Sequence, residues 1–141
     1  MCSLLYYIMK DPIAQIDEYA KEIEMDTSID VTNIMEKQLS CPNTKHKWLF
    51  KLIKAKKNLI DLVEAKDFYI QNKLAKDNPL NLSKSVIANK AESQMEFRAL
   101  QKSIKEQELL VEYLDSSVNK IFSQMGFDFK NLVDLLKMEQ L

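Results

Sequence analysis

The sequence predicts an all-α protein of long antiparallel helices with coiled-coil-like packing and short flanking helices. Its 141 residues include one glycine and three prolines, too few for hairpin-rich sheets or Gly-rich phosphate loops. Two long segments carry apolar residues at alternating intervals of three and four, which is typical of helices packed side by side. Hydrophobic residues make up 46% of the chain, enough to form a buried core. We therefore expect one helical domain over residues 1–141.

The first part of this domain, residues 1–40, is acidic and is expected to form short helices. It contains three lysines against eight acidic residues. Asp11 followed by Pro12 is typical of an N-cap and a first helical position, and predicts a helix to about Glu24. A further amphipathic stretch covers residues 29–39.

A long basic helix is expected over residues 44–75, after a break at Cys41-Pro42-Asn43. It would be about 48 Å long. One apolar seam on this helix consists of Trp48, Leu52, Ala55, Leu59 and Leu62. Further apolar residues widen the seam on one side, namely Leu49, Ile53, Ile60 and Val63. Because the resulting face is wider than one partner helix requires, we expect further helices or a second copy of the chain to cover it.

A second long helix is expected over residues 83–124, with a candidate break near Glu92. Its seam consists of Phe97, Leu100, Ile104, Gln107, Val111, Leu114, Val118, Ile121 and Met125. Two long helices joined by a short loop pack antiparallel. Gly126, the only glycine, is expected to end the helix in a left-handed conformation.

The last predicted element is a short C-terminal helix over residues 129–138. Its broad apolar face consists of Leu132, Val133, Leu135, Leu136 and Met138. A helix of about ten residues is marginal in water on its own, so this one must dock on a protein surface. We expect it to be an oligomerisation helix that docks on a neighbouring copy.

The composition argues against an enzyme and against a metal or another cofactor. Cys2, Cys41 and His46 cannot form a tetrahedral metal site without carboxylates, and no CxxC pair is present. Acidic residues at helical spacing arise by default in a helix rich in lysine and glutamate. The apolar stretch from Leu4 to Met9 is too short to span a membrane, and the expected compartment is the cytoplasm.

The lysines of the long basic helix are the main candidates for a binding surface. Residues 41–80 carry nine lysines against four acidic residues. On a helical projection Lys47, Lys51 and Lys54 form one stripe opposite the Leu52 seam. The nearby aromatic residues are Trp48, Phe50, Phe68 and Tyr69. Lysines beside aromatic rings suit single-stranded nucleic acid, although a lysine block can also be a solvated helix face.

Several short motifs follow one another along the chain. Ile29-Asp30 with Thr32 precedes Ser40, Pro42 and His46, and then Lys47-Trp48-Leu49. Lys66-Asp67-Phe68-Tyr69 places a basic residue close to an aromatic pair, and Val111-Glu112-Tyr113-Leu114 is followed by Gly126-Phe127-Asp128-Phe129-Lys130-Asn131. In this order the motifs resemble the UvsY recombination mediators of T-even-type bacteriophages, which carry a basic residue close to a Tyr-Tyr pair and a Gly-Phe-x-Ile-Lys-Asn ending.

This resemblance covers residues 13–138 and has two departures. Ile70-Gln71 replaces the family's Ser-Gly after the aromatic pair, and Val63-Glu64 stands where the family is more basic. The helix is therefore expected to continue past Tyr69, with weaker DNA affinity near that turn.

The resemblance implies a ring-like homo-oligomer, a hexamer or heptamer, that binds single-stranded DNA. Such a protein helps to load a RecA-like phage recombinase onto DNA covered by the phage single-strand-binding protein, in recombination, repair and replication within the infected bacterium. The DNA contacts predicted from the lysine block and the resemblance together are Lys45, His46, Lys47, Lys51, Lys54, Lys56, Lys57, Lys66, Phe68 and Tyr69. The alternative is a coiled-coil oligomeric adaptor whose basic helix binds an acidic protein.

Overall fold

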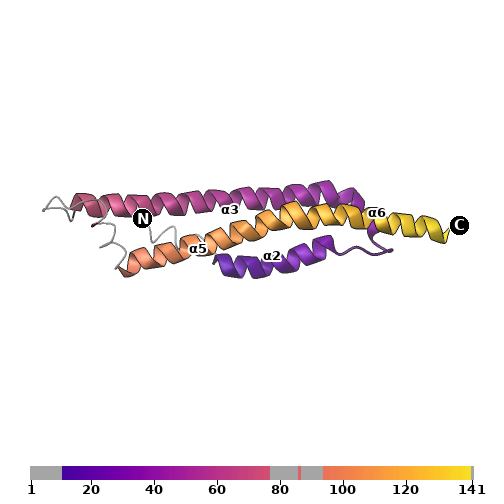
Figure 1. The fold of residues 1–141 in the computed structure, drawn as a ribbon, viewed down its shortest axis with the longest axis horizontal. Helices are drawn as coiled ribbons and strands as arrows, with labels where there is room; N and C mark the ends of the chain where they lie inside the picture. Colours follow the sequence, from indigo (N-terminus) through magenta and orange to yellow (C-terminus); the bar gives the residue numbers. More distant parts are fainter. Residues whose placement is uncertain (1–10, 77–85, 87–93, 141) are drawn as a thin grey trace.

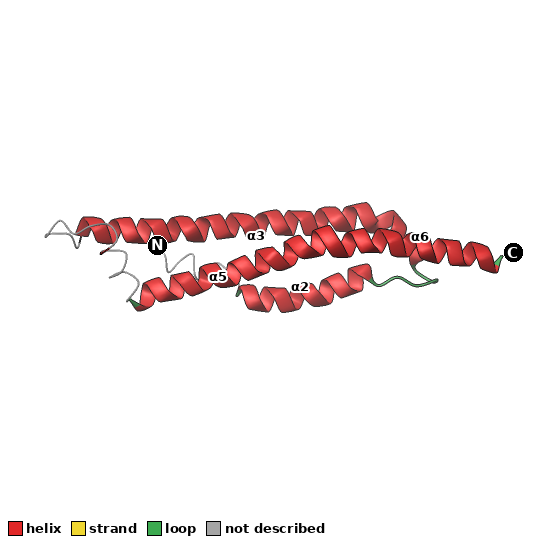
Figure 2. Ribbon diagram, viewed as in Figure 1, coloured by secondary structure: helices red, strands yellow, loops and turns green. Residues whose placement is uncertain are grey.

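The computed structural model describes residues 11–76, 86 and 94–140, and every regular element in them is helical (Figure 2). The elements are α2 (Pro12–Thr27), α3 (Ile34–Lys76), α5 (Met95–Ser116), the π-helix η1 (Ser117–Ile121) and α6 (Phe122–Glu139). Helices α3 and α5 lie side by side and run in opposite directions, and α2 packs against α5 (Figure 1). The predicted all-α fold with an antiparallel long pair is confirmed.

Helix α2 begins where the sequence predicts and ends one turn later. The Asp11 side chain accepts a hydrogen bond from the backbone N–H of Ile13 at 3.1 Å, and Pro12 occupies the first helical position. The link to α3 is capped reciprocally: Asp30 Oδ1 accepts from the backbone N–H of Asn33 at 3.0 Å, and Asn33 Oδ1 accepts from that of Asp30 at 2.8 Å.

Helix α3 contradicts the predicted break at Cys41-Pro42-Asn43. It runs from Ile34 to Lys76 with Pro42 in its interior, so the long helix is longer than the predicted 44–75. An interior proline costs about 3 kcal/mol. Burial outweighs this cost because Ile34 and Trp48, on either side of Pro42, belong to the same apolar core.

The rod of α5, η1 and α6 contradicts the predicted end at Gly126. Helix α6 continues through Gly126 to Glu139, so residues 129–138 are not a separate helix. Met125 and Phe129, on either side of the glycine, are both buried, and their burial holds this segment in helical form. The predicted start of the second long helix at residues 83–93, including the candidate break at Glu92, lies outside the described residues apart from the helical Val86.

The predicted seam on this rod is confirmed at its first four positions, from Phe97 to Gln107, and again at Leu114 and Met125, but it differs from the prediction at the other later positions. Beyond Gln107 the buried positions are Leu110, Leu114, Ser117, Phe122, Met125 and Phe129. A π-helical turn holds one more residue than an α-helical turn, so η1 lengthens the interval from Ser117 to Phe122 to five. The predicted seam residue Ile121 is therefore exposed.

A buried polar contact fixes the register of α3 against α5. Gln107 is buried within the seam, and its Nε2 donates to the backbone carbonyl of Ala55 at 2.9 Å. A buried amide without a partner costs about 1–3 kcal/mol, so any other register is penalised.

Part of the wide apolar face of α3 remains uncovered within one chain. Its exposed members are Leu49, Ile53, Ile60 and Val63. The intrachain bundle thus buries only the Trp48–Leu62 side of that face.

Candidate nucleic-acid interface

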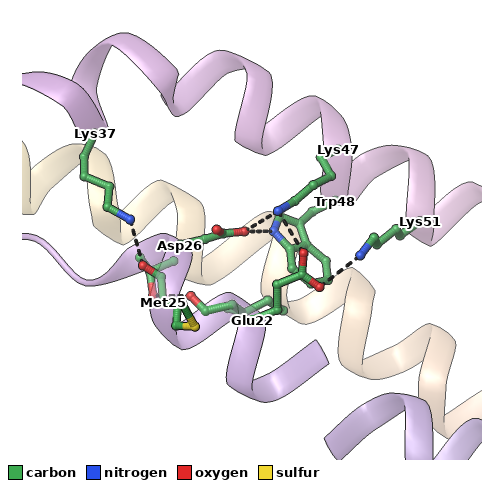
Figure 3. A network of polar contacts seen from close by, with 9 residues as sticks. Glu22, Met25, Asp26, Lys37, Lys47, Trp48 and Lys51 are labelled. Carbon is green, nitrogen blue, oxygen red and sulfur yellow. Dashed lines mark hydrogen bonds and ion pairs between the residues drawn. The ribbon is translucent and has the colours of Figure 1, made fainter. Parts of the chain in front are cut away.

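Acidic residues of α2 contact lysines of α3 in a cluster that we term the α2–α3 polar network (Figure 3). Its members are Glu22, Asp26, Lys37, Lys47 and Lys51. The two carboxylate oxygens of Glu22 each lie 3.1 Å from one ammonium, Oε1 from Lys47 and Oε2 from Lys51. Asp26 Oδ2 lies 2.7 Å from the Lys47 ammonium. Lys37 donates to the backbone carbonyl of Met25, in the last turn of α2, at 2.7 Å.

These contacts shift the pKa values of the charged groups. Desolvation alone would raise the pKa of Asp26, but the hydrogen bonds from Lys47 and Trp48 together outweigh it and leave the pKa below its usual value. The pKa of Glu22 is lowered in the same way, desolvation being outweighed by the hydrogen bonds from Lys47 and Lys51. Desolvation would lower the pKa of Lys47, but Asp26 and Glu22 raise it. Each partner therefore favours the charged form of the other.

Trp48 lies beneath this network and is fully buried. Its Nε1 donates to Asp26 Oδ2 at 2.8 Å, and its ring packs edge-on against Tyr19 at 5.5 Å between centroids. The Lys51 ammonium lies 4.6 Å from the centroids of both rings. Trp48 is a core residue and has no free face for a nucleic-acid base.

The structure therefore divides the predicted lysine stripe. Lys47 and Lys51 are paired with α2, whereas Lys54 is exposed. We term the exposed basic residues of α3 and the exposed Phe50 the exposed basic face, consisting of Lys45, His46, Phe50, Lys54, Lys56 and Lys57. By helical spacing His46, Phe50, Lys54 and Lys57 share one side of it, whereas Lys45 and Lys56 lie on the other side of the uncovered Leu49 and Ile53. Within the described residues, none of its four lysines forms an ion pair.

Phe50 stands out on the exposed basic face because this large apolar residue is 62% exposed. It precedes Lys54 by four residues and Lys57 by seven, so the three side chains share one side of α3. Sequence reasoning named Phe50 as a nearby aromatic but did not include it among the DNA contacts. Its spacing to two lysines, together with its place away from the Trp48 seam, is the signal that could have included it.

The predicted contacts near the end of α3 also point in different directions. Tyr69 faces α5, where its hydroxyl donates to Gln94 Oε1 and its ring lies 5.8 Å from that of Phe97. The Lys66 ammonium lies 5.9 Å from the Phe97 ring centroid. Phe68 is 61% exposed. Of these three predicted residues, only Phe68 presents its ring to solvent.

The predicted oligomerisation residues of α6 are divided in a similar way. Leu132 and Val133 pack against the apolar core of their own chain. Leu135 and Met138 are exposed, and Leu136 is partly exposed.

In the part of the chain that the structure describes, no three histidine, cysteine or acidic side chains gather as a metal site. None of the helices described is both long and apolar enough to cross a membrane.

One known structure shares this arrangement of helices. No family model matches the chain, and no curated protein matches its sequence. The crystal structure of the bacteriophage T4 recombination mediator protein UvsY matches with a TM-score of 0.75 at 16% sequence identity, and the match covers 88% of this chain and 98% of that one. The chain therefore has the fold of the T4 recombination mediator UvsY, in agreement with the resemblance carried by its ordered motifs.

Proposed function

We propose that this chain is a recombination mediator that binds single-stranded DNA and helps to load a RecA-like recombinase onto DNA covered by single-strand-binding protein. The fold shared with T4 UvsY and the ordered motifs support this role. Self-assembly into a ring of six or seven copies is part of the same proposal.

The observation that carries the DNA-binding part is the exposed basic face of α3. Four lysines there are exposed and form no ion pair within the described residues, and the exposed Phe50 lies within two helical turns of Lys54 and Lys57. Single-strand binders combine positive charge along the backbone with aromatic rings on which unpaired bases stack. In a ring the face would repeat, and one strand crossing several copies would bind more tightly without new kinds of contact.

Replacement of two lysines tests this proposal. The double variant Lys54→Ala/Lys57→Ala should bind oligo-dT severalfold more weakly than the wild type. Each phosphate contact contributes about 0.7 to the slope of log K against log salt for single strands, so the slope should flatten by up to about 1.4. Fluorescence anisotropy across a salt series measures both quantities.

The matched control removes two exposed lysines from α5, as Lys102→Ala/Lys105→Ala. It changes the net charge equally, and we expect smaller effects on affinity and slope. If the wild type does not bind oligo-dT, the proposal is wrong and the acidic-partner adaptor takes its place. If both double variants weaken binding equally, the exposed basic face is not the binding surface.

A further inference from the structure

The bridge between Glu22 and two lysines has the geometry of an anion site. The Glu22 carboxylate places one oxygen 3.1 Å from the Lys47 ammonium and its other oxygen 3.1 Å from the Lys51 ammonium (Figure 3). A phosphodiester also presents two oxygens, its non-bridging ones, that share one negative charge. Lysine ammoniums bind phosphate groups as point charges.

The network is open enough for exchange with an external anion. The side chains of Glu22, Lys47 and Lys51 are 38%, 39% and 26% exposed. Partly exposed ion pairs contribute little stability, so the Glu22 carboxylate can rotate into solvent without disrupting the fold.

We propose that Lys47 and Lys51 form a phosphodiester-binding site that Glu22 occupies in the free chain. Glu22 then lowers the affinity of α3 for single-stranded nucleic acid by competing for these two ammoniums. This inference rests on the proposed function and adds a built-in competitor to it.

Asp26 has a different role in the network. It accepts a hydrogen bond from the buried Trp48 as well as from Lys47, and its side chain is 22% exposed. Ile23, about one turn before Asp26 on α2, is buried in the core. Asp26 and Ile23 therefore keep α2 docked while Glu22 exchanges with phosphate, and the charges of Lys47, Lys51 and Asp26 then sum to +1.

Two substitutions of Glu22 test the inference in the full-length chain, with oligo-dT as the probe. Glu22→Gln should bind about three- to tenfold more tightly than the wild type. The salt slope should steepen by about 0.7 for each lysine released. Glu22→Asp keeps the charge, but its side chain is one methylene shorter and holds the carboxylate farther from the two ammoniums, so it should also bind more tightly at unchanged net charge.

The matched control is Glu18→Gln, one turn earlier on α2. Glu18 is exposed, and its replacement removes the same charge away from Lys47 and Lys51. We expect a smaller gain in affinity than for Glu22→Gln. Adding Lys51→Ala to Glu22→Gln should cancel most of the gain, and the helical circular dichroism of each variant should remain that of the wild type.

The outcomes separate this inference from the proposed function. If the wild type binds oligo-dT but Glu22→Gln binds no more tightly than Glu18→Gln, the competitor role is wrong and the DNA-binding role stands. Wild-type affinity for Glu22→Asp also overturns it. If no variant binds oligo-dT, both proposals are wrong.

Discussion

At the scale of single residues, two lysines of the predicted stripe pair with carboxylates of their own chain. The sequence predicted that Lys47, Lys51 and Lys54 share one stripe of α3, and helical geometry suffices for that. It could not show that Glu22 and Asp26 face two of them, because the partners lie 21 to 29 residues apart along the chain. Ion pairing between distant residues depends on how two helices pack, and the spacing of residues along one helix does not predict it.

Asp26 should make folding stability depend on pH in the acid range. Its pKa in the folded chain lies below the usual 3.8, so its stabilising contribution is present above about that pH and is lost as the pH falls through the folded-state value. Asp26→Asn should therefore lower the free energy of unfolding by about 1–2 kcal/mol at pH 7. Urea unfolding followed by Trp48 fluorescence should show this difference shrinking by pH 3.

The control for this measurement is Glu24→Gln, at an exposed position of α2. It should leave the unfolding free energy nearly unchanged at both pH values. A loss for Asp26→Asn that is equally large at pH 3 would mean that the Asp26 carboxylate stabilises the chain by packing rather than by its charge.

At the scale of elements, the sequence predicted which segments are helical better than where the helices end. The seams from Trp48 to Leu62 and from Phe97 to Gln107 were predicted from the periodic spacing of apolar residues, and this spacing still places them on one face of a helix in the folded chain. The breaks expected at Pro42 and Gly126 depend on single residues whose local preference the core overrides, because buried residues flank both positions. The π-helical turn Ser117–Ile121 has no comparable signal in the sequence, because it depends on how Phe122 and Met125 pack in the folded chain.

Gly126→Ala should stabilise the protein. The glycine lies inside α6, and a Cβ built on it meets no atom within 4 Å. Alanine is favoured over glycine in a helix interior by about 1 kcal/mol, and thermal unfolding followed by circular dichroism should show a higher midpoint. A lower midpoint would instead indicate a left-handed glycine that ends the helix, as the sequence alone suggested.

At the scale of the whole molecule, the charge asymmetry of the sequence is partly cancelled within the fold. Helix α2, which lies in the acidic part of the sequence, supplies the carboxylates that pair with Lys47 and Lys51 of α3. The exposed basic face remains for an external anion. The apolar surface is not fully covered, because one side of α3 and the end of α6 still present large apolar side chains to solvent.

The end of α6 gives the last prediction, which concerns assembly. Leu135 is 58% exposed and Met138 is 69% exposed, so their replacement should leave the protomer folded and act on contacts between copies. If α6 docks on a neighbour, Leu135→Ser/Met138→Ser should sediment as a smaller species than the wild type in analytical ultracentrifugation. The control Met95→Ser/Leu109→Ser removes two exposed apolar side chains from α5 and should sediment like the wild type. If the α6 variant keeps the wild-type mass, α6 is not the main contact, and the uncovered apolar side of α3 becomes the surface to test.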